Sequence, residues 1–424
     1  MKDFVLKGHI CYSKNKDTIL EYKNSYLVCK NGKSMGVFKK IPEEYKNLPI
    51  SDYGNRLIIP GFVDLHIHAP QFAYRGLGMN LELLDWLNKQ VFPEEAKYSN
   101  INYAEAAYSI FSEQLRKSAT TRACIFATIH RKATEYLMEA MENSGIISYV
   151  GKVNMDRNSP DDLIESTNGS ISDTKKWIKN CENKYKHTFP ILTPRFIPAC
   201  SDDLLKKLKN VQKTYNLPVQ SHLSENQKEI EWVKELSPDS KFYGDAYDNF
   251  GLFGNGTKTI MAHCVYSSDD EINLIKKNKV FVAHCPASNT NLSSGIAPVR
   301  KYLDKGLNIG LGSDVGAGHT ESIFRAIIDT IQMSKLYWRI IDDSCKPISF
   351  DEAFYLATLG GGKFFGKVGS FEKGYEFDAI VVDDSDLPYP QKLTIRQRLE
   401  RIVYLSSDIR GLFAKYVAGE KIIL

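Results

Sequence analysis

The chain has 424 residues, of which 43% are hydrophobic and 25% are charged, as in an ordinary soluble globular protein. These values exclude a disordered chain, a collagen-like chain and a small disulfide scaffold. The 55 basic and 51 acidic residues leave a net charge of +4, without the concentrated basic charge typical of a nucleic-acid-binding protein. No apolar run approaches the roughly 18 residues of a membrane span.

The start of the chain and its cysteines predict a cytoplasmic protein. Residues 1–17 lack the apolar core of a signal peptide. The eight cysteines are scattered without a Cys-x-x-Cys spacing, which indicates reduced thiols rather than a disulfide framework. A chain of this length buries a large core unaided, so any metal is expected to serve chemistry rather than folding.

The two ends of the chain predict a small β-domain. Within residues 1–56, short strands are expected at 4–11, 25–30 and 34–38, and the Asn31-Gly32 pair between the last two is a hairpin signal. Within residues 366–424, short strands are expected at 379–383, 402–404 and 421–424. We predict that residues 1–56 and 366–424 together form this domain beside a larger one.

The central segment, residues 57–365, predicts a catalytic (β/α)8 barrel of the TIM type. Eight apolar runs occur at residues 57–65, 121–126, 147–153, 190–196, 219–223, 259–263, 280–284 and 307–313. Helix-like stretches lie between them, at residues 202–215, 226–236, 269–278 and 322–338 among others, and Asp202 and Asp269 are expected helix starts. The rival α/β architecture, a doubly wound open sheet, usually has fewer strands and a glycine-rich phosphate loop, which this sequence lacks.

Histidines and an aspartate at the strand ends predict a metal centre. The side chains of His66 and His68 share one face of the first strand because they are two residues apart. His222, His263 and Asp314 end the fifth, sixth and eighth runs, and the C-terminal strand ends of a barrel surround one cavity. A lone strand-end histidine is more often a packing residue, but the combination favours metal binding.

The ligand types suit zinc, with Fe(II) as the alternative, and such an ion lowers the pKa of a bound water. His284 ends the seventh run, but the ligand set is complete without it and its role stays open. Cys264 and Cys285 each follow a histidine, so we expect their side chains to point away as packing thiols.

Glu225 lies three residues beyond His222, where a helix is expected to begin. A carboxylate at a helix N-terminus is often there for the helix dipole alone. Here the carboxyl group is within reach of a substrate atom beside the metal, so we favour a role in proton transfer.

Six segments resemble one family of metal-dependent barrels. They are residues 60–71 (PGFVDLHIHAPQ), 193–196 (TPRF), 221–226 (SHLSEN), 262–263 (AH), 284–289 (HCPASN) and 312–315 (GSDV). The chain resembles the amidohydrolase superfamily and, within it, most closely the guanine deaminases. Its fourth run has no lysine to bridge two metals, which implies a site for a single ion.

The resemblance implies a role for each site residue. His66, His68, His222 and Asp314 would hold one zinc ion, and His263 would orient the water beside it. Gln71, Arg195 and Phe196 would bind the purine, which would also contact His222, Glu225, His263 and Asp314. Trp86 could line this pocket, although a core position is favoured, and His319 is left without a role.

The implied reaction is hydrolysis of guanine to xanthine and ammonia in purine catabolism or salvage. Glu225 would deliver a proton to N3, and Asp314 would take a proton from the attacking water and pass it to the leaving amine. The resemblance also implies a homodimer, with neither nucleic acid nor membrane as a partner. The alternatives are an aminohydrolase or chlorohydrolase of another purine, pterin or triazine ring, and a non-catalytic metal-binding barrel.

Overall fold

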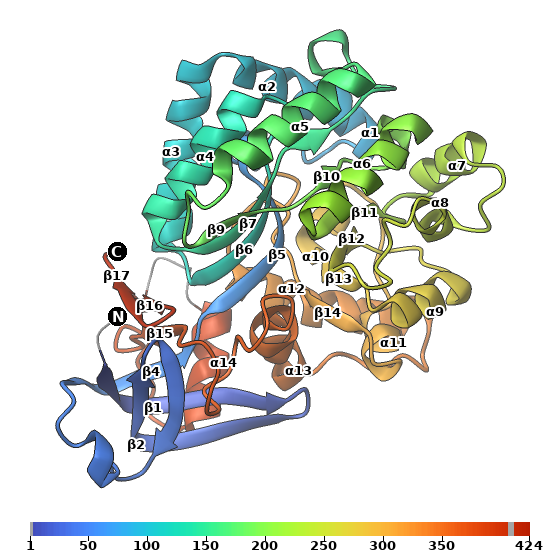
Figure 1. Ribbon diagram of the computed structural model, residues 1–424. Helices are drawn as coiled ribbons and strands as arrows, with labels where there is room; N and C mark the ends of the chain where they lie inside the picture. Colours follow the sequence, from blue (N-terminus) through green and yellow to red (C-terminus); the bar gives the residue numbers. More distant parts are fainter. Residues whose placement is uncertain (1–2, 406–410) are drawn as a thin grey trace.

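A parallel barrel forms the centre of the computed structural model, which describes residues 3–405 and 411–424 (Figure 1). Two four-stranded parallel sheets build it. In spatial order their strands are β5 (Phe62–His68), β6 (Thr120–Phe126), β7 (Ile147–Gly151), β9 (Thr188–Pro190), β11 (Val219–Leu223), β12 (Thr259–His263), β13 (Phe281–His284) and β14 (Asn308–Leu311). The amide of Asp314 donates to the oxygen of His66 (2.8 Å) and that of Leu192 to the oxygen of Pro218 (2.9 Å), which closes both seams. The predicted α/β barrel is therefore confirmed.

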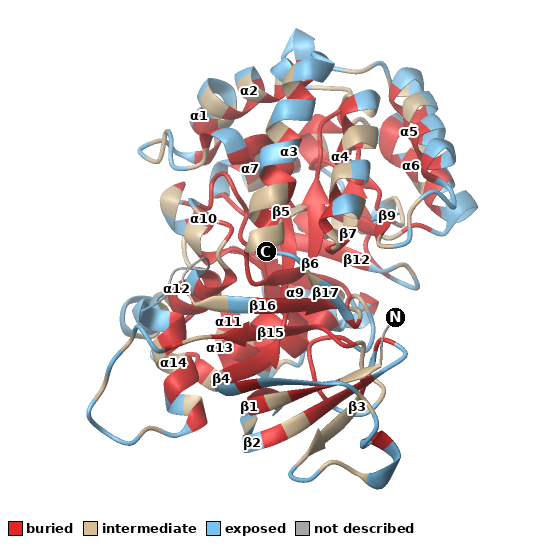
Figure 2. Cartoon of the chain, turned by 90° about the vertical axis from the view of Figure 1, so that its left-hand side faces the viewer, coloured by how far each residue is buried: buried red, intermediate tan, exposed pale blue. Residues whose placement is uncertain are grey.

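Helices cover the outside of this barrel. They are α3 (Ile101–Lys117), α4 (Arg131–Ser144), α5 (Thr167–Cys181), α6 (Asp202–Tyr215), α7 (Gln227–Leu236), α8 (Tyr243–Asn249), α9 (Asp269–Asn278), α10 (Pro286–Asn291), α11 (Val299–Asp304), α12 (Ile323–Leu336) and α13 (Phe350–Tyr355). Figure 2 shows the strands buried and the outer helix faces exposed. The helix predicted at 202–215 is confirmed, but Ser201, not Asp202, caps it through a side-chain bond to the amide of Leu204. Likewise Ser268, not Asp269, caps α9.

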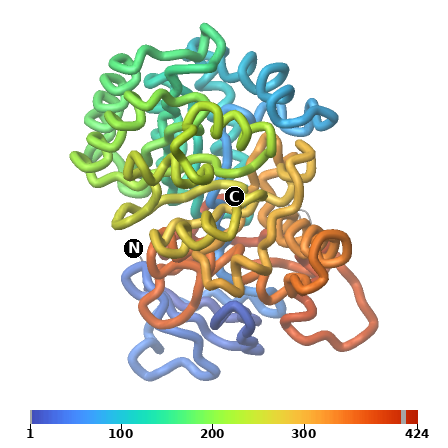
Figure 3. Tube along the Cα trace, turned by 90° about the vertical axis from the view of Figure 1, so that its right-hand side faces the viewer, coloured from blue at the N-terminus to red at the C-terminus, as the bar shows by residue number. Residues whose placement is uncertain are grey.

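A seven-stranded sheet joins the two ends of the chain. Its order is β17 (Glu420–Ile422), β16 (Leu412–Val417), β15 (Ala379–Val382), β4 (Ile50–Pro60), β1 (Phe4–Asn15), β2 (Thr18–Lys30) and β3 (Lys33–Phe38). Figure 3 shows the blue N-terminal and the red C-terminal segments together at one end of the molecule. The hairpin signal is confirmed: Asn31 and Gly32 have φ of 51° and 71°, and Lys30 pairs with Lys33. The division at residues 56 and 366 stays a prediction.

Some of the predicted strands are divided in the structure. The run 57–65 is two strands, because β4 extends to Pro60 in the terminal sheet and β5 begins at Phe62. Gly61 makes this crossing between sheets, and a Cβ there would lie 2.2 Å from Cγ2 of Thr121. The run 190–196 is interrupted: β9 ends at Pro190 and the short β10 (Thr193–Pro194) pairs with β8 (Val153–Asn154).

The strand predicted at 402–404 is wrong. Those residues lie in helix α14 (Ile395–Leu405), whose buried side chains Ile395, Leu399, Ile402 and Val403 recur at helical spacing. Strand β16 instead supplies the neighbour of β15 in the sheet. Among the described residues, no helix combines the length and the apolar character needed to cross a membrane.

Candidate active site

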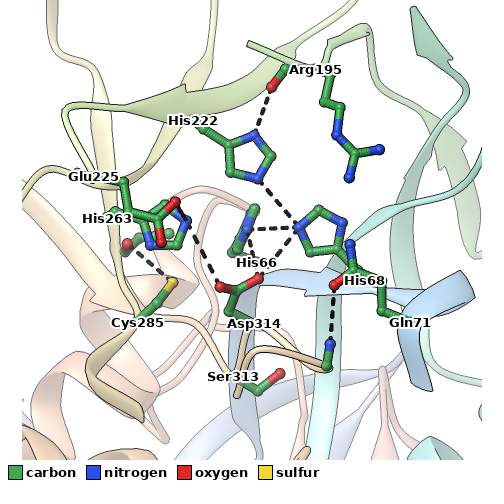
Figure 4. A network of polar contacts seen from close by, with 12 residues as sticks. His66, His68, Gln71, Arg195, His222, Glu225, His263, Cys285, Ser313 and Asp314 are labelled. Carbon is green, nitrogen blue, oxygen red and sulfur yellow. Dashed lines mark hydrogen bonds and ion pairs between the residues drawn. The ribbon is translucent and has the colours of Figure 1, made fainter. Parts of the chain in front are cut away.

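Four predicted metal ligands meet at the C-terminal ends of the barrel strands (Figure 4). Nε2 of His68 lies 3.2 Å from Nε2 of His66 and 3.3 Å from Nε2 of His222. Oδ1 of Asp314 lies 3.2 Å from Nε2 of His66 and 3.3 Å from Nε2 of His68. Strands β5 and β11 and the segment after β14 thus bring one nitrogen or oxygen from each residue to a common point.

These separations fit a tetrahedral ion. Ligand atoms held about 2.0–2.1 Å from zinc at tetrahedral angles are about 3.3 Å apart. Nδ1 of His222 donates to the backbone oxygen of Arg195 at 2.6 Å, so its Nε2 carries the free lone pair that a metal needs. The donor set and its spacing therefore suit a single metal ion.

Burial keeps the ligands in the protonation states that metals bind. It lowers the pKa of His66, His68 and His222, so their imidazoles are neutral. For Asp314, burial alone would raise the carboxyl pKa, but the polar contacts of this group with His66 and His263 outweigh burial and hold the pKa well below its usual range. Neutral imidazoles and an ionised carboxylate are the forms that metals bind.

His263 stands beside this cluster and is held by Asn289. Its Nδ1 donates to Oδ1 of Asn289 (2.9 Å), so Nε2 faces Oε2 of Glu225 at 3.4 Å and Oδ2 of Asp314 at 3.8 Å. The backbone of His263 has a φ of 72° and that of Asp314 a φ of 48°, a left-handed conformation that non-glycine residues seldom adopt. Such conformations cluster at functional sites, where they aim a side chain.

Glu225 is 3% exposed and faces the cluster from the loop between β11 and α7. Burial, with a further contribution from Asp314, raises the pKa of its carboxyl well above the usual value. Oε1 accepts a bond from the hydroxyl of Ser294 (3.2 Å). Glu225 lies before the helix rather than capping it, because Asn226 is the N-cap of α7. The group is therefore a buried acid directed at the cavity.

Glu229, which the sequence analysis did not single out, lines the same cavity one helical turn further on. Its Oε2 accepts from the amides of Glu225 (3.1 Å) and Asn226 (3.4 Å), and Oε1 accepts from the hydroxyl of Tyr243. Burial raises the pKa of Glu229 to about 7. The capping-box spacing from Asn226 to Glu229 was the available signal, and it indicates a role in holding the Glu225 loop.

The cavity brings the predicted purine-binding residues to the candidate metal ligands. Gln71 follows β5 on a turn, while Arg195 and Phe196 follow β10, and all three line the cavity. Trp86 lines it too, so this residue is both buried and a pocket wall. A small apolar pocket with a few polar groups is the usual form of a small-molecule site.

The structure separates the remaining histidines and cysteines. His284 is buried without a hydrogen-bond partner among the described residues, and burial lowers its pKa to about 3. His319 is exposed. Cys264 and Cys285 are buried as predicted. However, Sγ of Cys285 lies within 4.8 Å of the possible metal-binding atoms of His263 and Asp314. Cys285 lies beyond the end of β13, where strand alternation no longer sets direction, and burial raises its thiol pKa, which disfavours the metal-binding thiolate.

Comparisons with known proteins identify the family of this chain. Residues 57–414 match the amidohydrolase family. The guanine deaminase of Dictyostelium discoideum is 41% identical over 385 residues, covering 88% of this chain and 84% of that protein. That of Homo sapiens is 37% identical over 382 residues, covering 87% and 83%.

A crystal structure of guanine deaminase from C. acetobutylicum, with guanine bound in the active site, superimposes with a TM-score of 0.96. The two sequences are 49% identical and both chains are covered completely. The chain therefore belongs to the amidohydrolase family, within its group of guanine deaminases.

Proposed function

We propose that this protein hydrolyses guanine to xanthine and ammonia, a step of purine catabolism or salvage. One observation carries the proposal. A single cavity is lined by the candidate metal ligands, by the buried acid Glu225, and by Arg195 and Gln71, which can form hydrogen bonds with a purine. The guanine deaminases that this chain resembles support the choice of substrate.

His66, His68, His222 and Asp314 would hold one zinc ion, with Fe(II) as the alternative. Such an ion supplies a water that ionises near neutral pH. The other groups move protons and orient the reactants. Nε2 of His263 can accept a bond from the water, because its Nδ1–H is occupied by Asn289.

Glu225 and Asp314 divide the proton transfers between them. As water adds to C2 of guanine, Glu225 delivers its proton to N3 and regains one from the water, and its raised pKa favours the protonated carboxyl group that this step needs. Asp314 accepts the second water proton and passes it to the amine at C2, which leaves as ammonia. The C2 carbonyl then forms, and the proton on N3 remains in xanthine.

The purine would lie with C2 beside the ligands and O6 at the far wall. Guanine offers O6 and N7 as acceptors and N1–H as a donor. The guanidinium of Arg195 supplies donors for O6, and Gln71 offers both kinds of hydrogen bond. Phe196 would pack on the ring.

An ammonia-release assay over a panel of purines, pterins and triazines tests this function. Guanine is expected to be the preferred substrate. Preferred turnover of a pterin or a triazine would support the related ring hydrolases instead. A bound stoichiometric metal without ammonia release from any ring would support the non-catalytic barrel.

We expect one metal ion per chain, because four donor atoms of this structure surround one position. Treatment with a chelator should remove the ion and the activity together, and added zinc should restore the activity. Elemental analysis before and after treatment checks both. Two tightly bound ions per active chain would contradict a site for a single metal.

We further propose that the protein works in the cytoplasm as a homodimer, independent of nucleic acid and membranes. The eight free cysteines, all buried, support a reducing compartment. Three exposed apolar side chains around the end of α12, those of Leu336, Ile340 and Ile341, support a contact with a second copy.

A further inference from the structure

Glu95 lies behind the purine-binding residues, and nothing in its sequence context indicated a function. It belongs to the short helix α2 (Phe92–Ala96), which continues from α1 (Leu83–Trp86) through the π-helical turn Leu87–Val91. Turns of this kind are frequent at functional sites. Glu95 is 2% exposed, yet it does not line the cavity. Whatever it does for a substrate must therefore act through its neighbours.

Those neighbours are Gln71 and Arg195, which would form hydrogen bonds with the edge of the purine that lies away from the metal ligands. Nη1 of Arg195 donates to Oε2 of Glu95 at 2.5 Å, and Nη2 donates to Oε1 at 3.1 Å. The same Oε1 accepts from Nε2 of Gln71 at 3.0 Å. One buried carboxylate thus binds Arg195 through both of its oxygens and Gln71 through one.

This arrangement fixes which end of the Gln71 amide faces which way. A carboxylate can only accept, so it must face the amide nitrogen. On the other side, the amide of Gly316 donates to Oε1 of Gln71 at 3.3 Å, and a backbone N–H can only donate. In Figure 4 the nitrogen of Gln71 is directed toward Arg195, and its oxygen lies on the side of the metal ligands.

The order of hydrogen-bonding groups along Gln71 and Arg195, an acceptor followed by donors, matches the N1–H donor and the O6 acceptor of guanine. Glu225 and Gln71 stand on opposite sides of the metal ligands in Figure 4, so a ring with N3 toward Glu225 has N1 toward Gln71. The second lone pair of the Gln71 oxygen can then accept from N1–H. The guanidinium of Arg195, whose two terminal nitrogens are bound by Glu95, would donate its remaining N–H groups to O6.

We propose that Glu95 is a positioning residue that sets the purine specificity of this site. By holding the Gln71 oxygen and the Arg195 donors in this order, Glu95 selects rings that carry a donor at N1 and an acceptor at C6. The inference rests on the proposed hydrolysis of guanine.

2,6-Diaminopurine tests this selectivity separately from the hydrolysis at C2. It keeps the amine at C2 that is to be hydrolysed, but N1 is an acceptor and C6 carries an amino donor. Both groups therefore have the wrong polarity for Gln71 and Arg195. A site built to hydrogen-bond one group rejects an analogue without it by about 10,000-fold or more, so the wild-type protein should strongly prefer guanine.

Glu95→Gln keeps the size of the side chain but replaces one acceptor by a donor. Either Arg195 or Gln71 then faces a donor, and the orientation of the Gln71 amide is held only by the longer bond from Gly316. We expect the ratio of kcat/KM for guanine to that for 2,6-diaminopurine to fall about 100-fold. The loss on guanine should lie more in KM than in kcat, with the metal content unchanged.

Two further variants separate positioning from stability. Glu95→Asp still offers only acceptors, so it should keep the guanine preference within about ten-fold of wild type even where KM rises. Glu352→Gln breaks a similar buried pair, in which Arg300 donates to both oxygens of Glu352 at 2.7 Å, away from the cavity. It should lower stability without changing the ratio.

The wild-type protein is measured first, and absence of guanine hydrolysis there would contradict the proposed function itself. If wild type hydrolyses guanine but Glu95→Gln keeps the wild-type ratio, the role of Glu95 is overturned. If Glu95→Gln cannot be obtained folded, the Glu95→Asp variant decides. A retained guanine preference supports the proposal, and a preference lost by more than about ten-fold contradicts it.

Discussion

Glu225→Gln is expected to lower kcat for guanine by about 100- to 10,000-fold while the metal stays bound. Glutamine keeps the size and polarity of the side chain but cannot carry the proton that N3 requires. The structure gives no other function to this carboxyl group that would explain such a loss. It is not among the four clustered ligands, and Asn226, not Glu225, caps the following helix.

Glu229→Gln is the matched control for this variant, because Glu229 lines the same cavity and is equally buried. Its oxygens are occupied by two backbone amides and the hydroxyl of Tyr243, so we expect a loss of less than about ten-fold. Single-turnover rates and metal analysis of both variants make the comparison. Wild-type turnover by a Glu225→Gln protein that keeps its metal would show that Glu225 is not needed for proton transfer.

Arg195→Ala is expected to raise KM for guanine and to narrow the gap in kcat/KM between guanine and 2,6-diaminopurine. 2,6-Diaminopurine keeps the amine at C2 but lacks O6 and presents an amino donor at C6 to the guanidinium, which has no acceptor to offer. Unpaired buried polar groups are why a site of this kind rejects such analogues, by up to about 10,000-fold. Rates on both bases, with metal content, measure the effect. Equal activity of the wild-type protein on both bases would refute the assignment.

The alanine variant also leaves Glu95 as an unpaired buried charge, which costs about 3–5 kcal/mol of stability. Arg195→Lys is therefore the second variant, because it keeps the charge but cannot pair with both oxygens of Glu95 while also facing O6. An intermediate KM is expected for it. An unchanged guanine preference in both Arg195→Ala and Arg195→Lys would show that Arg195 does not contribute to recognition of the base.

The convergence of the four candidate metal ligands could be predicted because they are tied to the most regular part of the fold. His66, His68 and His222 lie on strands whose ends must converge once a barrel forms. Asp314 follows β14, the last strand of the barrel. Their types also restrict the chemistry. Strand periodicity and a barrel rule were therefore sufficient to bring together residues almost 250 positions apart.

The support behind the substrate pocket could not be predicted in this way. Glu95 lies 100 positions from Arg195, on a short helix whose place depends on a π-helical turn that has no clear sequence signal. Residues 402–404 show a related limit. Their branched and aromatic side chains favour a strand, but burial of Leu399 and Ile402 along one helix face decides the outcome. Tertiary packing, not local pattern, sets both positions.

The most direct test of the central claim is to incubate the metal-loaded protein with guanine and quantify both products. The account predicts xanthine and ammonia in equal amounts, with formation of both abolished by the chelator and restored by zinc. Failure to convert guanine by a protein carrying one metal per chain, or equal hydrolysis of adenine, would contradict it.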